Sequence, residues 1–387
     1  MTDSNSYPVM IVGGGPVGLF LALSLTRSGI RCKVLEKRSS VDRRSKSIGI
    51  HPVSLELFDE LGITGEFLSS GLKIHRGHAF IGKKRIGDLS FESCRPPHNY
   101  ILAIPQYRTE EILENALRKV DPECLTREAD VSAVRRAGQT ADVFYSVKDE
   151  LFRSDAEWVI GCDGKNSIVR RSAGIPSYNR SYPDTYIMGD FTDNTLFGND
   201  AAVYLHRDGL IESFPLPGGK RRWVAKTDRY IENPDGKQLH NLIGQRLNRV
   251  LPDQSYSRIS SFGVQHLLAS NFRKNRCLLA GDSAHIVSPI GGQGMNLGFI
   301  TGRHLATALQ QIFSNPAKAD SLLADYSAKS RRIAGQVSRR AEMNMRIGRE
   351  YKHPLVRHML VRTMIMPPFQ QLTANAFTMR GLDKWPV

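Results

Sequence analysis

The feature that most constrains this chain is a glycine-rich turn near its N-terminus, where Gly13, Gly15 and Gly18 have the spacing Gly-x-Gly-x-x-Gly. The apolar residues 9–12 predict a short buried strand before the turn, and residues 16–28 predict a helix after it. In such a unit the first glycine permits a tight turn, the second lets the backbone approach a pyrophosphate, and the third lets helix and strand pack closely. The sequence therefore predicts a Rossmann-type unit that binds a dinucleotide.

An acidic residue follows this turn at the distance expected of a nucleotide-binding carboxylate. Residues 31–36 predict the second strand, and Glu36 closes it, close to the ~20 residues beyond the last glycine that such sites have. A carboxylate at this point binds ribose hydroxyl groups. It therefore favours an unphosphorylated ribose, as in FAD or NAD.

A second glycine-rich segment lies far along the chain. Residues 277–280 predict a buried strand, and Gly281 and Asp282 follow it. We expect this segment, continuing to the run Pro-Ile-Gly-Gly-Gln-Gly-Met-Asn at residues 289–296, to end the strand and open a helix. The segment would place a carboxylate and exposed backbone N–H groups at a helix N-terminus, where negative charge is stabilised, and by itself it suggests an anionic ligand. Two such segments on one chain predict a long, two-ended cofactor such as FAD.

The remaining patterns predict an α/β fold with an α+β insert. A helix is expected at about residues 109–119, with Glu110 and Glu111 in its first turn. Residues 158–161 predict a buried strand, and residues 184–264 a mainly antiparallel sheet with a hairpin around residues 210–219. The expected organisation is a discontinuous Rossmann-like FAD-binding domain (residues 1–75, 100–180 and 265–330), an inserted substrate-binding sheet domain (76–99 and 181–264) and a C-terminal helical segment (331–387).

Three motifs in this order resemble those of the single-component, class A FAD-dependent aromatic hydroxylases typified by para-hydroxybenzoate hydroxylase. Besides the first glycine turn, they are Gly-Cys-Asp-Gly at residues 161–164 and Gly-Asp at residues 281–282, and the resemblance covers roughly residues 8–310. It implies that the motif containing Asp163 serves FAD and NAD(P)H, that Asp282 binds the flavin ribitol, and that residues 289–296 lie beside the flavin ring. It also implies that Gln106 lies near FAD and that the backbone of Val131 contacts adenine. The candidate cofactor-binding residues are Gly13, Gly15, Pro16, Gly18, Glu36, Lys37, Arg44, Lys46, Gln106, Val131, Asp163, Gly281, Asp282, Pro289, Gly292, Gly294, Met295 and Asn296.

The activity implied by this resemblance is that of an NAD(P)H-dependent monooxygenase. It would hydroxylate an aromatic, quinone-like or polyketide-type substrate with O2 through a C4a-hydroperoxyflavin, which a substrate domain over the ring protects from water. A single Gly-x-Gly-x-x-Gly motif agrees with NADH or NADPH visiting transiently. The flavin carries the chemistry, so no catalytic side chain is assigned, and no metal site is expected. The candidate substrate-binding residues are Tyr204, His206, Phe214, Pro215, Arg222 and Trp223.

The chain departs from the family pattern at two places. The family often has Arg-Ala before Gly-Ile-His, where this chain has Lys46-Ser47. Lysine keeps the charge but lacks the planar fork of arginine, which leaves open whether Arg44 or Lys46 meets the cofactor. The family also usually has Asp-Ala where this chain has Thr301-Gly302, so a contact of that helix differs.

The net charge of +15 first suggests a nucleic-acid partner. The basic residues are spread along the chain without a nucleic-acid-binding motif, so no such partner is expected. They are densest between Arg331 and Arg362, where apolar residues alternate with them; this fits either a solvated helical face or peripheral contact with an anionic membrane. The five cysteines form no Cys-x-x-Cys pair, which favours a reducing compartment and a cytoplasmic protein. A monomer and a homodimer both fit the sequence.

Two other functions stay open at this stage. One is a flavin-dependent reductase of isoprenoid double bonds, resembling geranylgeranyl reductases. The other is a membrane-recruited FAD-binding protein without catalysis. The basic, apolar C-terminal segment is the feature that keeps both of them under consideration.

Overall fold

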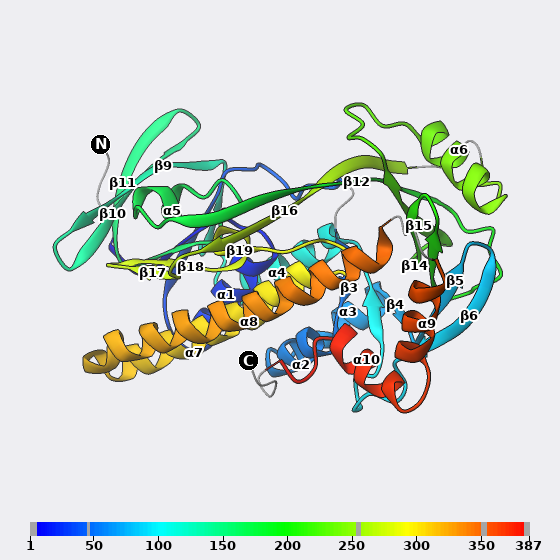
Figure 1. Ribbon diagram of the computed structural model, residues 1–387. Coiled ribbons are helices and arrows are strands. Elements are labelled where there is room, and N and C mark those ends of the chain that lie inside the picture. Colours follow the sequence, from blue (N-terminus) through cyan, green and yellow to red (C-terminus); the bar gives the residue numbers. More distant parts are fainter. Residues whose placement is uncertain (1–5, 45–46, 253–256, 350–353, 383–387) are drawn as a thin grey trace.

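A parallel sheet of the Rossmann type forms one half of the molecule in the computed structural model, which describes residues 6–44, 47–252, 257–349 and 354–382 (Figure 1). β1 (Ser6–Val12) lies between β2 (Cys32–Glu36) and β11 (Glu150–Gly161) and is parallel to both. Two further strands of this eight-stranded sheet are β8 (Leu125–Arg127), which is parallel to β2, and β18 (Cys277–Leu279), which is parallel to β11. The remaining strands, β9 (Ala129–Ala137), β10 (Thr140–Val147) and β17 (Arg273–Lys274), are antiparallel to the strands beside them.

The first β-α-β unit agrees closely with its sequence prediction. Helix α1 (Pro16–Arg27) begins at a proline, connects β1 to β2 and packs beside α4 and α7, and residues 9–11 of β1 are fully buried. Helix α4 (Gln106–Val120) begins three residues earlier than expected. Glu110 therefore lies in its second turn, where it pairs with Gln106 and Arg38, and not in the first turn beside the helix N-terminus.

The second eight-stranded sheet is mainly antiparallel, as predicted. Two long strands, β12 (Ser177–Thr192) and β16 (Ser257–Ala269), run from the region of the first sheet into the second (Figure 1). The predicted hairpin is formed by β14 (Gly209–Leu216) and β15 (Lys220–Thr227). The remaining strands are β13 (Ala201–His206), β5 (Arg76–Ile81), β6 (Lys84–Ser90) and β19 (His285–Ile286), and only the β13–β5 pair is parallel among the described pairings of this sheet.

One helix in this region was not predicted. Helix α6 (Gly236–Leu247) packs on the second sheet, and a capping box between Asp235 and Gln238 fixes its start. The small third sheet contains β3 (Gly49–Ile50), β4 (Leu72–Ile74) and β7 (Ile101–Ala103), and the short helices are α2 (Pro52–Glu60), α3 (Thr64–Ser70) and α5 (Ile168–Ser172).

The last part of the chain is helical, as expected. Helices α7 (Gln293–Ser314) and α8 (Ala319–Gly348) pack on each other, and α9 (Pro354–Ile365) and α10 (Phe369–Phe377) pack near the second sheet. Helix α8 continues without a break through residue 331, where the C-terminal helical segment was expected to begin. The division of the chain into domains stays a prediction. Within the described residues, none of the helices is long and apolar enough to cross a membrane.

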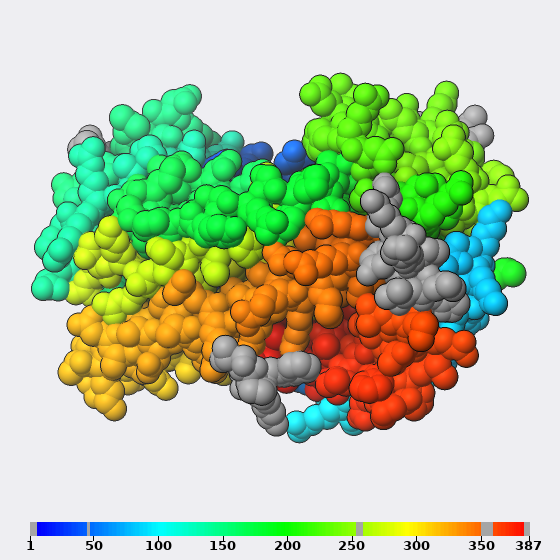
Figure 2. All heavy atoms as spheres, in the orientation of Figure 1, coloured from blue at the N-terminus to red at the C-terminus, as the bar shows by residue number. Residues whose placement is uncertain are grey.

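Glycines bring the two glycine-rich segments together. A Cβ atom at Gly298 of α7 would lie 2.4 Å from Cγ2 of Val17 on α1, and one at Gly281 would lie 3.2 Å from the same atom. Any larger residue at position 298 would push the two helices apart. On one face of the molecule, a notch separates the parts formed by the two sheets, and N-terminal residues lie at its base (Figure 2).

Candidate cofactor and substrate site

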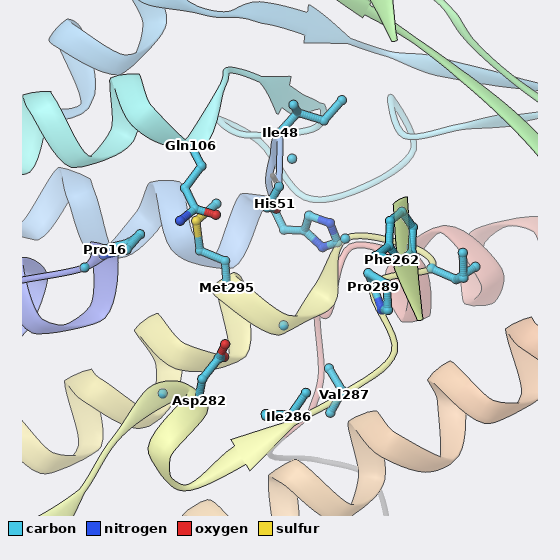
Figure 3. A pocket seen from close by; sticks show the side chains of 18 of the residues that line it. Pro16, Ile48, His51, Gln106, Phe262, Asp282, Ile286, Val287, Pro289 and Met295 are labelled. Atoms are coloured by element: carbon cyan, nitrogen blue, oxygen red, sulfur yellow. The ribbon is translucent and has the colours of Figure 1, made fainter. Parts of the chain in front are cut away.

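One large cavity extends from the first glycine turn to the second sheet. Its volume of about 1170 Å³ exceeds the roughly 300–1,000 Å³ typical of a small-molecule site, so it has room for a dinucleotide and a second ligand. Both glycine-rich segments and the central strands of the second sheet line it. In Figure 3, Pro16, Gln106, Asp282 and Met295 surround one part of this space, and His51, Phe262 and Pro289 surround another.

The first glycine turn has the geometry that its spacing predicts. Gly13 has a φ of +105°, and a Cβ there would lie 2.4 Å from the carbonyl oxygen of Cys162. A Cβ at Gly18 would lie 2.0 Å from the carbonyl oxygen of Gly13, so neither position accepts a side chain. Gly15 has nothing within 4 Å of its missing Cβ and lines the cavity, which leaves the backbone open to a ligand. The turn therefore suits a pyrophosphate.

Glu36 lies beside this turn and is held in its charged form. Its carboxylate accepts a hydrogen bond from the N–H of Gly14 at 2.6 Å and from Nε of Arg38 at 2.8 Å. Burial by itself raises the pKa of Glu36, but the bonds from Arg38 and Gly14 outweigh burial and lower it below the usual value. The backbone N–H of Arg38 at 2.9 Å and its Nη2 at 3.4 Å also donate to Glu36, so protein donors take up the about four acceptor positions of the carboxylate, and a ribose hydroxyl group would have to displace one of them.

One carboxylate oxygen of Asp163 binds backbone N–H groups, and the other is buried 3.1 Å from the position that a Cβ of Gly161 would occupy. Oδ2 accepts from the N–H groups of Ile168 and Val169 at 2.7 and 3.2 Å, at the start of α5. Oδ1 is buried without a hydrogen-bond partner in the described structure, and the residue lines the cavity. The open backbone at Gly15, directly before the start of α1, shows that the residues present fit a dinucleotide cofactor.

The second glycine-rich segment differs from its prediction in one respect. Gly281–Ser283 form a single 3₁₀ turn, followed by β19, and the long helix α7 begins only at Gln293. Asp282 is therefore not at the N-terminus of that helix, although it is exposed and lines the cavity. The left-handed backbone of Gly292 (φ +65°) starts α7 without a side-chain cap. The first N–H groups of α7, near Gly294 and Met295, therefore remain available at the cavity wall.

The side chain of Asn296 binds other residues of the protein. The prediction that it contacts the cofactor is therefore corrected. Its side chain is fully buried and lies outside the cavity lining. Oδ1 accepts from the N–H of His51 at 2.8 Å and from Oγ of Ser54 at 2.7 Å. Nδ2 donates to the carbonyl oxygens of Gly49 and Gly292, both at 2.9 Å. The amide therefore ties the glycine loop to the segment that enters α2.

The other cofactor candidates lie as follows. Arg44 lines the cavity with an exposed side chain that pairs with Asp42 at 2.6 Å, whereas Lys46 lies outside the described residues. Gly18 is outside the cavity lining and packs against the carbonyl oxygen of Gly13. Gln106 donates to Glu110 at 2.8 Å. The candidates in the cavity lining are Gly13, Gly15, Pro16, Glu36, Lys37, Arg44, Gln106, Val131, Asp163, Gly281, Asp282, Pro289, Gly292, Gly294 and Met295.

The alternation of side chains along the strands divides the substrate candidates. Phe214 and Arg222 face the cavity, as expected. Tyr204 and Trp223 instead belong to the buried cluster on the opposite face, with helix α6, so their assignment is corrected. Pro215 is one position out of phase with Phe214, and His206 lies at the end of β13, where it pairs with Asp208 at 3.3 Å. Neither of these two lines the cavity. A shift of one residue along a strand reverses the face that a side chain occupies.

Sequence reasoning missed several residues of the cavity wall. The C-terminal helices contribute Asn344, Met364 and Phe377, which no motif predicted. Glu212 of β14 also lines the cavity, and the available signal was a charged residue in the otherwise uncharged stretch of residues 210–216. Its side chain is buried, and burial raises its pKa to about 7.

The two histidines near the site serve packing. Burial lowers the pKa of His51 to about 4, and its ring stacks on Phe377 with centroids 6.4 Å apart. Burial also lowers the pKa of His285 to about 4, and its Nε2 lies 3.0 Å from Oγ1 of Thr301. Both rings are therefore neutral at physiological pH. Thr301 is one of the positions at which the sequence departs from the family pattern, and this hydrogen bond shows what the threonine contacts.

Taken together, the parallel sheet, its glycine turn and the facing antiparallel sheet define a dinucleotide-binding protein with an adjoining second-ligand pocket. Comparison with known proteins makes this more specific. Residues 6–341 match the family model described as FAD binding domain. A 12-dehydrotetracycline 5-monooxygenase/anhydrotetracycline 6-monooxygenase of Streptomyces rimosus is 30% identical over 358 residues, which cover 86% of this chain and 68% of that protein. A rifampicin monooxygenase of Streptomyces venezuelae is 30% identical over 339 residues, covering 86% and 69%.

Solved structures agree. The OxyS anhydrotetracycline hydroxylase from Streptomyces rimosus superposes with a TM-score of 0.81 at 26% identity, covering 97% of this chain and 76% of that one. The p-nitrophenol 4-monooxygenase from Pseudomonas putida shares the fold, with a TM-score of 0.87 at 21% identity and coverage of 97% and 98%.

The chain therefore belongs to the family of FAD-dependent aromatic hydroxylases and monooxygenases, and the predicted resemblance is confirmed. This membership identifies the dinucleotide of the site as FAD. An uncharacterized aromatic compound monooxygenase of Bacillus subtilis, 30% identical over 311 residues, is longer: the matched part is 78% of this chain but 61% of that protein.

The four hydrogen bonds of Asn296 give a first prediction. Asn296→Ala removes them and leaves buried N–H and C=O groups unpaired, so we expect the free energy of unfolding to fall by about 3 kcal/mol and FAD to bind less tightly. Chemical denaturation and FAD titration measure the two effects. The matched control is Asn179→Ala, an exposed asparagine on β12. An Asn296→Ala protein as stable as this control would contradict the bridging role.

Glu212 gives a second prediction. Its folded-state pKa of about 7 lies above the ordinary value of 4.5, so its contribution to stability is complete below pH 4.5 and is lost as the pH rises through 7. Glu212→Gln removes this loss, and we expect the variant to gain about 3 kcal/mol relative to wild type between pH 5 and 8.5. Denaturation curves across this range test it, with Asp208→Asn in the same hairpin as control. Parallel pH profiles for wild type and Glu212→Gln would refute the assignment.

Proposed function

We propose that this protein is an NAD(P)H-dependent FAD monooxygenase that inserts one atom of O2 into an aromatic or polyketide-type ring. The observation that carries the proposal is the composition of the large cavity. One part has the groups that fit FAD, and the adjoining part is an apolar wall of the second sheet and the C-terminal helices. The two parts are continuous, so a ring bound on the wall would meet the flavin end of the cofactor.

The residues on the first sheet would hold the two ends of FAD. The glycine turn would face the pyrophosphate, and Glu36 the adenosine ribose. Asp282 would bind the ribitol, and the N–H groups near Gly294 and Met295 would face the pyrimidine end of the flavin. When bound, FAD supplies the chemistry of accepting a hydride from NAD(P)H and of activating O2. The N-terminus of α7 stabilises negative charge at that end.

The second sheet and the C-terminal helices have a different task. Val203, Leu205 and Val224 present an apolar surface to the cavity, and Met364 and Ile365 approach it from α9. Such a wall binds a ring through its apolar surface and excludes water from the reacting atoms. The names of the relatives, which include tetracycline-type and rifampicin monooxygenases, support a large ring substrate. The scattered cysteines support a cytoplasmic location.

The cofactor part of the proposal predicts a loss of FAD from one variant. Asp282→Ala removes a carboxylate that faces the cavity, and a charge-assisted hydrogen bond is worth about 1.5–3 kcal/mol, so we expect FAD affinity to fall roughly tenfold or more. Fluorescence titration of the apoprotein with FAD measures it. Asp325→Ala, at an exposed position on α8, should retain wild-type affinity. Full FAD occupancy in the Asp282→Ala protein would remove Asp282 from the site.

The reaction itself is tested with isotopically labelled O2. The FAD-loaded protein is incubated with NADH or NADPH and a panel of phenols, quinones and polyketides, and the products are analysed by mass spectrometry. One labelled oxygen atom per product molecule supports the proposal. Reduction of isoprenoid double bonds without oxygen incorporation would support the flavin reductase instead. FAD binding without turnover of any substrate would support a non-catalytic protein.

A further inference from the structure

The sheet wall of the cavity has one carboxyl group that the cofactor part of the site does not use. Glu212 lies on β14, opposite Val203 of β13 and Val224 of β15, and all three residues line the cavity. Its relative exposure is 7%, so it faces the ligand space and not bulk solvent. The adjacent residues, Ile211 and Ser213, are fully buried on the other face of the strand. The alternation of β14 thus fixes the direction of the carboxyl group.

Among the described residues, Glu212 differs from the other titratable groups of this wall because no oppositely charged side chain pairs with it. Arg222 binds both oxygens of Asp190, at 2.6 and 3.0 Å. His78 lies between Asp88 and Asp200, at 3.0 and 3.2 Å. Across the described residues, the side chain of Glu212 has neither a hydrogen bond nor an ion pair. A group buried in this way gains more from a hydrogen bond with a ligand than a solvated group does.

The surroundings of Glu212 determine which ligand group suits it. Leu205, Leu210 and Val224 belong to the apolar cluster on this face, together with Met345 of α8. A second negative charge beside Glu212 would be buried without a cation, since Arg222 is already committed to Asp190. A neutral hydroxyl group donates a hydrogen bond to the carboxylate and adds no charge.

On the basis of the proposed function, we propose that Glu212 is a specificity-determining residue: it binds a hydroxyl group on a neutral aromatic substrate and rejects rings that carry a carboxylate. The O–H of the ring donates to a carboxylate oxygen, and no bond is broken in this step. The hydrogen bond shifts electron density from the O–H bond toward oxygen and into the ring, which favours attack by an electrophilic oxygen. Glu212 thereby selects phenol-type rings within the substrate class.

Binding of three probes of similar size tests this assignment without turnover. The FAD-loaded protein, without NAD(P)H and at pH 8, above the pKa of about 7 that burial gives Glu212, is titrated with 4-chlorophenol, chlorobenzene and 4-chlorobenzoate while the flavin absorbance is recorded. A phenol is neutral at this pH and a benzoate is ionised. We expect wild type to bind 4-chlorophenol about tenfold more tightly than chlorobenzene, as one charge-assisted hydrogen bond predicts, and to bind 4-chlorobenzoate most weakly.

The variants assign the preference to this carboxyl group. Glu212→Leu should lose the preference for 4-chlorophenol over chlorobenzene while still binding chlorobenzene, which shows that the pocket is intact. Glu212→Gln, of nearly the same shape, should bind 4-chlorobenzoate about tenfold more tightly than wild type does, because the like charge is gone. Asp208→Asn removes the same charge from the exposed turn of the same hairpin, so it should behave as wild type.

Two outcomes would overturn the proposal. One is wild-type protein that binds 4-chlorobenzoate as tightly as 4-chlorophenol, a result that needs no variant. The other is Glu212→Leu protein with the wild-type preference. Because the probes report binding alone, a protein that hydroxylates nothing but shows the expected preference would refute the monooxygenase function and leave the role of Glu212 in place. If the protein inserts oxygen into a substrate but substitutions of Glu212 do not change probe binding, the monooxygenase function is supported and the role of Glu212 is refuted.

Discussion

The structure depends on the close approach of backbones at the ends of β1 and β11. A Cβ at Gly13 would lie 2.4 Å from the carbonyl oxygen of Cys162, and one at Gly18 would lie 2.0 Å from that of Gly13. These contacts place the start of α1 directly over the sheet, and Val17 then meets Gly281 and Gly298, which are far along the chain. Packing at these four glycine positions thus joins segments separated by more than half of the sequence. The cofactor site is a consequence of this packing, because the same turn exposes the backbone at Gly15.

The second sheet forms the rest of the cavity through the two-residue period of its strands. Alternate residues of β13, β14 and β15 face the ligand space, and those between them pack against α6. Helices α8 to α10 complete the wall from the other side. Residues of the substrate part therefore come from widely separated segments, whereas the FAD part is built around two short motifs. Substitutions at single strand positions can therefore change the substrate part of the cavity without disturbing the FAD part.

This difference explains what the sequence could predict. The first β-α-β unit and the hairpin around residues 210–219 follow local rules of periodicity and turn chemistry, and both were predicted closely. The direction of Tyr204 and Trp223 depends on strand register, which the apolar character of both faces conceals, because α6 covers the face away from the cavity. The start of α7 at Gln293 depends on left-handed glycines at positions 291 and 292, and a glycine run alone does not show which of them adopts that conformation. The contributions of Asn344 and Phe377 depend on tertiary packing, for which no local signal exists.

The distribution of charge within the cavity follows the same division. At the FAD part, Glu36 is satisfied by backbone and arginine donors, so the burial of its charge costs little. At the sheet wall, Arg222 is likewise neutralised by Asp190, but Glu212 is buried with no such partner in the described structure. An apolar residue of similar size at position 212 would pack against Val203 and Val224 without this electrostatic cost. A fold gains nothing by burying an unpaired carboxyl group, so a ligand is the simplest source of the missing interaction, and perturbed groups of this kind are concentrated at functional sites.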